Sequence, residues 1–259
     1  MDFNLWTDMF PLISTVLGLI LGSFSNVCIH RYLNETSIIR PGSHCPRCAH
    51  TLSWWENIPL LSYLLLRGAC RTCRQPIGLR YPLVEAISGL WALLIALKFG
   101  PGWPWLVYLV FGWILIVISF IDLDSFLLPD IYTIPGALAA FACATFLLPL
   151  SWSDSLIGAA AGGGGFWLIQ KSYKALKGIE GLGTGDIKLM LLLGALLGWQ
   201  ALPIMIFLSS ISGLAVSVLY LLKKEANGLQ TAIPFGPFLS LGGMIYILIG
   251  PEIWRWYLG

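Results

Sequence analysis

Four cysteines form the strongest chemical pattern in this 259-residue sequence. They occur as two Cys-x-x-Cys pairs, Cys45 with Cys48 and Cys70 with Cys73, and 21 residues separate the pairs. Each pair bends the chain so that two thiolates reach one ion, and two pairs complete the tetrahedral site that zinc prefers. We predict a structural zinc ion held by these four residues. A redox-active dithiol and unligated thiols are the alternatives.

Aspartates at two distant places form a second pattern. Asp122 and Asp124 follow a long uncharged segment, and Asp186 ends the short run Gly183-Thr184-Gly185-Asp186. Two carboxylates that lie close together cannot both ionise cheaply, so one keeps a proton and the other stays charged. Such a pair can activate a water molecule for attack on a peptide carbonyl and protonate the leaving amine, which is aspartyl-protease chemistry. Helix capping is the alternative role for Asp186.

The composition shows what must position these residues. Hydrophobic residues make up 57% of the chain and charged residues 11%, and the mean hydropathy is +0.80. Crossing a bilayer takes about 20 apolar residues, so we predict an all-α polytopic membrane protein with about eight transmembrane helices. The expected helices are 10–29, 82–99, 103–121, 131–150, 154–171, 186–199, 201–222 and 232–250. Acids at the ends of such spans are candidates for function.

The uncharged stretch 189–222 is expected to cross twice. As one helix of 34 residues it would be about 51 Å long, which exceeds the hydrocarbon thickness. A turn near Gly198 to Pro203 would separate two crossings. Small residues at helix-contact spacing, such as Gly18 with Gly22 and Gly158 with Gly162, favour tight helix packing.

The charge distribution predicts the orientation in the membrane. Eight crossings place 13 of the 15 lysines and arginines on one face, and only Lys98 and Arg255 on the other. The 13 are Arg31, Arg40, Arg47, Arg67, Arg71, Arg74, Arg80, Lys171, Lys174, Lys177, Lys188, Lys223 and Lys224. The positive-inside rule makes their face cytoplasmic, where thiols stay reduced and a metal is favoured over disulfides. A net charge of +2 is too small to indicate a nucleic-acid binder.

Three parts of the chain follow from these patterns. Residues 1–29 are the first transmembrane helix, residues 30–81 form a cytoplasmic four-cysteine zinc-binding loop, and residues 82–259 form a multi-helix membrane peptidase core. The loop is too small for a self-sufficient hydrophobic core, so metal binding would supply folding energy. His44 and His50 flank the first cysteine pair and are expected to be spectators, because four cysteines already saturate zinc.

The sequence resembles the type IV prepilin peptidases, also called leader peptidases with N-methyltransferase activity. The resemblance covers nearly the whole chain in matched segments that occur in the family's order. These are Gly22-Ser23-Phe24 with Asn26 and Val27, Pro41 to Cys48, Glu56-Asn57-Ile58-Pro59-Leu60, Leu66-Arg67-Gly68, the second cysteine pair, Arg80 to Glu85, Ile121-Asp122 through Asp130, and Gly183-x-Gly-Asp186.

The resemblance implies a bifunctional enzyme of the bacterial cytoplasmic (inner) membrane. Such an enzyme cuts the leader of prepilins or pseudopilins after a glycine at the cytoplasmic face and methylates the new amino terminus with S-adenosylmethionine. The family's catalytic pair maps onto Asp122 and Asp186, with Asp124 as the alternative first acid. Its cysteine tetrad maps onto the four cysteines above. The sequence departs from the family at Ala69, where family members often carry a basic residue. This departure leaves the peptidase interpretation intact and weakens the methyltransferase interpretation.

The methyl-donor site is expected in the four-cysteine loop. The loop is too short for a dinucleotide-type fold and carries no glycine-rich strand-to-helix fingerprint. Glu56, Asn57 and Gly68 are the candidates for binding the donor, because polar and small residues beside the metal could receive a cationic sulfonium. Local packing within the loop is the alternative for each.

Two other classes of protein remain open from the residues alone. An ion- or proton-coupled transporter with a structural zinc loop would use acids within its spans. A zinc-loop scaffold that recruits partners would need neither aspartate. The position of the acids at one edge of the membrane favours the peptidase over the transporter, since only Glu85 lies farther into a span.

Overall fold

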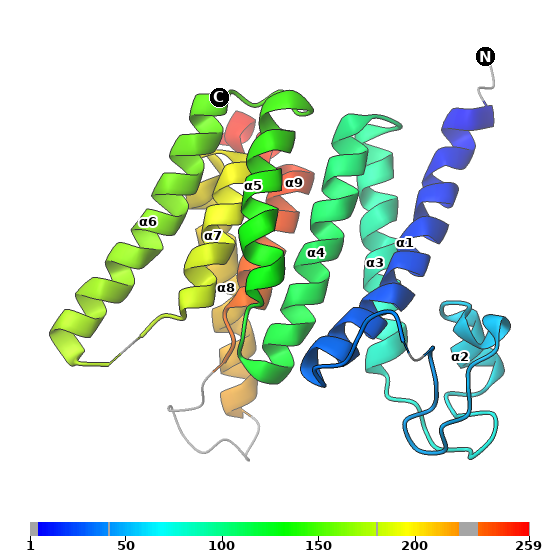
Figure 1. The fold of residues 1–259 in the computed structure, drawn as a ribbon. Helices are drawn as coiled ribbons and strands as arrows, with labels where there is room; N and C mark the ends of the chain where they lie inside the picture. The colour runs from blue at the N-terminus through cyan, green and yellow to red at the C-terminus, as the bar shows by residue number, and fades with distance from the viewer. Residues whose placement is uncertain (1–4, 41, 180, 223–232, 259) are drawn as a thin grey trace. The chain divides into compact units, whose positions relative to one another are not determined.

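The computed structural model describes residues 5–40, 42–179, 181–222 and 233–258, and within them the fold is helical (Figure 1). Eight long helices confirm the predicted all-α architecture: α1 (Leu5–Leu33), α3 (Arg80–Phe99), α4 (Trp103–Ser125), α5 (Asp130–Phe146), α6 (Trp152–Lys177), α7 (Thr184–Leu197), α8 (Ala201–Leu222) and α9 (Gly236–Leu258). Pro41, Lys223, Lys224 and the predicted start of the last span at residue 232 lie outside the described residues.

Five of these helices are long and apolar enough to cross a membrane. They are the segments Asp8–Leu33, Arg80–Phe99, Trp103–Ser125, Ala201–Leu219 and Gly236–Tyr257. The helix Asp130–Phe146 is apolar but shorter. A chain with several such helices is a polytopic membrane protein.

The predicted break in the long uncharged stretch is confirmed. Helix α7 ends at Leu197 and α8 begins at Ala201. Gly198 ends α7 with a φ of +79°, a conformation that favours glycine over residues with a Cβ. With 14 residues, α7 is only about 21 Å long.

The chain forms two compact units, residues 1–117 and residues 118–259, with the boundary inside α4. In the first unit α1 packs directly on α3, because a Cβ at Gly22 would lie 2.7 Å from the Cα atom of Glu85. In the second unit α6 and α7 meet backbone to backbone at Gly158 and Gly194. The small residues therefore serve the close helix packing that their spacing predicts.

The segment between α1 and α3 is irregular, with a 3-10 turn η1 (Trp54–Asn57) and the short helix α2 (Leu61–Leu65). Two isolated antiparallel bridges, His44 with Thr51 and Ala69 with Pro76, are its only β-pairs among the described residues. Figure 1 shows this loop beside the ends of α1 and α3 to which it is joined.

Candidate functional site

Asp122 lies in the last turn of α4 and is buried, with 4% of its surface exposed. Its Oδ2 atom accepts a hydrogen bond from the backbone N–H of Gly236, the first residue of α9, at 3.1 Å. A Cβ at residue 236 would lie 2.6 Å from that oxygen, so only glycine allows this approach. The contribution of Gly236 was not apparent from the sequence, where this residue falls inside the expected helix 232–250.

Asp186 lies in the first turn of α7 and is also buried, with 8% exposed. The N-cap of this helix is Gly183, so the alternative role of Asp186 as the N-cap residue itself is wrong. The Asp186 carboxylate instead lies back over the N-cap, with Oδ2 3.1 Å from where a Cβ at Gly183 would be. The missing Cβ at Gly183 therefore leaves room for the carboxylate, whereas Leu128 covers the backbone at Gly185.

The two aspartates belong to the same unit and lie near each other. Leu128 packs against a glycine next to each aspartate. A Cβ at Gly185, which precedes Asp186, would lie 2.7 Å from the Cβ of Leu128, and a Cβ at Gly236, which binds Asp122, would lie 3.0 Å from its Cδ2. The structure thus brings together two acids that are 64 positions apart in the sequence.

The neighbouring acids are placed differently. Asp124 is exposed, whereas Asp122 on the same helical turn is buried. Asp130, at the start of α5, forms an ion pair with Lys188 of α7 at 2.5 Å between Oδ1 and Nζ, and its carboxyl group is largely exposed. Asp122 is therefore the better partner for Asp186 on grounds of burial.

The four predicted cysteines come together in the loop, with their sulfur atoms all within 4.8 Å of one another. The Sγ atoms of Cys45 and Cys73 are 3.8 Å apart, and those of Cys48 and Cys70 are 4.0 Å apart. A tetrahedral zinc ion with Zn–S bonds of about 2.3 Å requires sulfur pairs about 3.8 Å apart. The cysteine cluster can therefore hold a metal ion of this kind.

The two Cys-x-x-Cys turns have the same local geometry. In each, the residue four positions after the first cysteine donates its N–H to that cysteine's carbonyl at 3.0 Å, from Ala49 to Cys45 and from Arg74 to Cys70. Both donors have positive φ, 56° and 57°. Hydrogen bonds from the backbone of Cys48 and then of Arg47 lower the pKa of Cys45 to about 6, which favours the thiolate that a metal requires.

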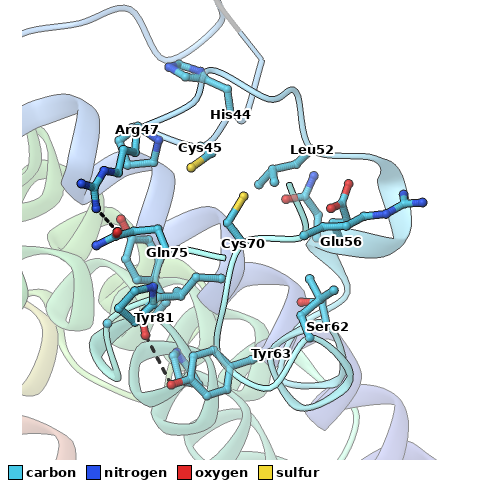
Figure 2. A pocket seen from close by; sticks show the side chains of 18 of the residues that line it. His44, Cys45, Arg47, Leu52, Glu56, Ser62, Tyr63, Cys70, Gln75 and Tyr81 are labelled. Carbon is cyan, nitrogen blue, oxygen red and sulfur yellow. Dashed lines mark hydrogen bonds between the residues drawn. The ribbon is translucent and has the colours of Figure 1, made fainter. Parts of the chain in front are cut away.

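A cavity of about 550 Å³ lies between the cysteine turns and the start of α3 (Figure 2). This volume is within the range of small-molecule sites. Of the three predicted donor-binding residues, Glu56 and Asn57 line the cavity. Gly68 does not line it, but a Cβ there would lie 2.8 Å from the Oη atom of Tyr63, which does. Further lining residues include Ser62, Arg71, Gln75, Tyr81 and Glu85.

Glu56 is the cavity's most unusual side chain. Its Oε2 atom accepts the N–H of Ser53 at 2.7 Å and lies 3.2 Å from Nε2 of His50. Its buried Oε1 atom has no hydrogen-bond partner among the residues that the structure describes. The Ser53 backbone hydrogen bond lowers the pKa of Glu56, so the group is ionised at neutral pH. A buried acceptor left without a partner is costly, and a cationic ligand would satisfy it. The contact of His50 with Glu56 was not predicted from the sequence.

The structure is that of a helical membrane protein with two buried aspartates at helix ends and a cluster of four cysteines that could hold a metal ion. The chain matches the model of the bacterial peptidase A24 N-terminal domain over residues 16–99 and that of the type IV leader peptidase family over residues 109–218. No solved structure matches it.

Full-length relatives agree with these matches. The chain is 41% identical to a prepilin leader peptidase/N-methyltransferase of Aeromonas hydrophila, over 94% of this chain and 92% of the relative. It is 38% identical to one of Pseudomonas putida, over 97% and 96%, and 39% identical to one of Pseudomonas aeruginosa, over 96% and 93%. The chain belongs to the type IV leader peptidase family.

Proposed function

We propose that this protein is a bifunctional membrane enzyme that removes the leader of type IV prepilins or pseudopilins after a glycine and then methylates the new amino terminus. The names of its relatives, and their coverage of nearly the whole chain, support this activity. The observation that carries the peptidase half is that Asp122 and Asp186 are both buried in one unit and that Leu128 packs against the glycine beside each of them, Gly236 and Gly185.

In this proposal the two aspartates share the work of peptide hydrolysis. The ionised carboxylate takes a proton from a water molecule, whose oxygen attacks the carbonyl carbon of the scissile glycine. The protonated carboxyl group gives its proton to the departing amide nitrogen, so the products are a carboxylic acid and a free amine. The N–H of Gly236 orients the Asp122 carboxylate, and the missing Cβ at Gly183 leaves room for the Asp186 carboxylate beside the helix N-terminus.

Paired substitutions test the dyad. Asp122→Asn and Asp186→Asn keep size and polarity but remove the acid–base function, so each should lower leader cleavage by roughly 10²- to 10⁴-fold. Asp124→Asn is the matched control, because Asp124 is exposed on the same turn, and it should cleave normally. Cleavage by purified variants in detergent is the measurement. Loss of cleavage in Asp124→Asn with retention in Asp122→Asn would transfer the role to Asp124.

The cavity in the loop is proposed to bind S-adenosylmethionine. When bound, this donor supplies an electrophilic methyl group on a cationic sulfonium. The unpartnered Oε1 atom of Glu56 offers a buried negative charge for a cationic part of the donor, and Asn57 beside it offers an amide for polar groups. Gly68 acts indirectly, because its positive φ of 68° and its lack of a Cβ let Tyr63 reach the carbonyl of Ile77 at 3.3 Å.

The four cysteines are proposed to hold one structural zinc ion. The spacings between the four sulfur atoms support this metal. Cysteines 45 and 70 also line the cavity, so the ion would hold two of its walls together. Metal analysis of the purified protein should give one zinc per chain, and a protein with intact folding and no metal would contradict the proposal.

Both sites are proposed to lie on the cytoplasmic side of a bacterial inner membrane. Residues 30–81 are the zinc loop, and residues 82–259 are the membrane-embedded peptidase core. The last turn of α6 carries Lys174 and Lys177, and the first turns of α7, which follows it in the chain, carry Asp186 and Lys188. The basic residues that set the orientation therefore lie at the same helix ends as the catalytic aspartate. An impermeant maleimide should label Ser151→Cys in spheroplasts and spare Lys177→Cys. The opposite labelling would reverse the orientation.

A further inference from the structure

A buried carboxylate on α3 has no role in either proposed reaction. Glu85, with 9% of its surface exposed, lies within the first two turns of that helix and lines the loop cavity. Its Oε2 atom accepts the backbone N–H of Leu60 at 2.8 Å. The hydrogen bond joins the irregular loop to a membrane-spanning helix across 25 positions of sequence.

The residue that donates this hydrogen bond, Leu60, is conformationally strained. Leu60 has a φ of +59°, a region that residues with a Cβ rarely adopt because of steric clash with the backbone. Leu60 is also the N-cap of α2 and has no side-chain cap within its own segment. The Glu85 carboxylate therefore stabilises a backbone conformation that the leucine would not adopt by itself.

Leu60 sits between the two segments that build one side of the cavity. Before it, η1 carries Glu56 and Asn57, and after it, α2 carries Ser62 and Tyr63. The backbone angle at Leu60 sets how these segments face each other. Figure 2 shows Glu56, Ser62 and Tyr63 arranged around the cavity.

The helix that supplies Glu85 is itself held in place. The backbone of α3 at Glu85 contacts Gly22 of α1 so closely that a Cβ on the glycine would lie 2.7 Å away. Asn26 of α1 adds a hydrogen bond to the carbonyl of Tyr81 at 3.0 Å, one turn earlier on α3. Glu85 thus projects from a rigid support, whereas Leu60 belongs to an irregular segment.

We propose that Glu85 is a positioning residue for methyl transfer: its hydrogen bond to Leu60 fixes the turn between η1 and α2 and so shapes the donor cavity around Glu56. This inference rests on the proposed binding of S-adenosylmethionine in that cavity. The Glu85 carboxylate acts through the backbone of Leu60, and its effect is expected on donor affinity. Leader cleavage takes place in the other unit and should be independent of it.

Three variants of the full-length protein in detergent test the role of Glu85. Glu85→Ala removes the acceptor and should raise the KM for S-adenosylmethionine roughly tenfold, the effect expected from loss of a hydrogen bond to a charged group. Its kcat for methylation and its leader cleavage should stay within about twofold of wild type. Glu85→Gln keeps an oxygen acceptor and should restore most of the affinity. Ser88→Ala, one turn later on α3, removes a buried hydroxyl that has no hydrogen-bond partner in the described part of the chain, and it should leave KM unchanged.

A fourth variant tests the mechanism. Glycine adopts positive φ without strain, so in a Leu60→Gly background the Glu85→Ala substitution should raise KM by a smaller factor than in the wild type.

The Glu56→Gln variant distinguishes failure of this inference from failure of the proposed donor site. If Glu56→Gln raises the KM and Glu85→Ala does not, the positioning role is wrong. If neither changes it, the donor binds elsewhere and both proposals fail. A comparable loss of cleavage in Glu85→Ala would also overturn the inference.

Discussion

The two candidate sites are built in different ways. The aspartates of residues 118–259 lie at the ends of long helices, where regular backbone and close helix packing fix their positions. The loop site of residues 1–117 is built on irregular backbone instead. Five of the six non-glycine residues with positive φ among the described residues fall within it: Glu35, Ala49, Leu60, Arg67 and Arg74. A segment with so much strained backbone depends on specific hydrogen bonds for its shape, and the proposed zinc ion would add a further constraint.

The comparison predicts that the loop and the helical site can be broken separately. Removal of zinc by a strong chelator, or the Cys45→Ser substitution, should lower methyl transfer on the order of a hundredfold because metal binding supplies the loop's folding energy. Leader cleavage should persist in the same samples. Zinc content and both activities are measured together. Equal loss of the two activities would show that the loop also supports the peptidase.

The reverse separation is expected at the start of α9. Gly236→Ala places a methyl group 2.6 Å from Oδ2 of Asp122, which must shift the carboxylate or the helix. Cleavage should fall roughly tenfold or more, since small misplacement of a catalytic group is costly, while methylation of an already cleaved pilin should be unchanged. Gly165→Ala is the control, because a Cβ there would meet no described atom within 4 Å. Normal cleavage by Gly236→Ala would argue against a fixed Asp122.

A smaller effect is expected from the charge of Glu56. Glu56→Gln removes the negative charge but keeps the shape, so the KM for S-adenosylmethionine should rise roughly tenfold with cleavage intact. The pKa of Glu56 is lowered by the Ser53 N–H, so its ionised form persists below the usual value of about 4.3. Its contribution is therefore complete above that value and is lost only as the pH falls through the lowered pKa. Donor affinity of the wild type that weakens between pH 7 and pH 5 would contradict this assignment.

The smallest expected effect concerns His50. Its Nε2 atom is 3.2 Å from Oε2 of Glu56, which still keeps the stronger bond from Ser53. His50→Ala should raise the donor KM only about two- to fivefold and leave zinc content unchanged, because the histidine is not needed to complete a four-cysteine site. Titration of zinc in the variant tests the second point, and loss of metal would make His50 a ligand.

The sequence predicted the helical framework well, because an uncharged segment long enough to cross a bilayer can satisfy its backbone hydrogen bonds there only as a helix or within a closed barrel. The break near Gly198 followed from the same length argument. The cysteine cluster was predictable because Cys-x-x-Cys spacing constrains geometry locally. Three hydrogen bonds were found only in the structure, because contacts between residues far apart in the sequence or in irregular segments produce no periodic pattern. They join Asp122 with Gly236, Glu85 with Leu60, and Glu56 with His50.

The central claim is that one chain uses a helical site for cleavage and a separate loop site for methylation. Its most direct test is to incubate the detergent-solubilised protein with a prepilin and isotopically labelled S-adenosylmethionine, and to determine the mass of the product's amino terminus. Wild type should give a pilin cut after the glycine and carrying one labelled methyl group, Asp122→Asn an uncut substrate, and Cys45→Ser a cut but unmethylated product. A cut and fully methylated product from both variants would contradict the account.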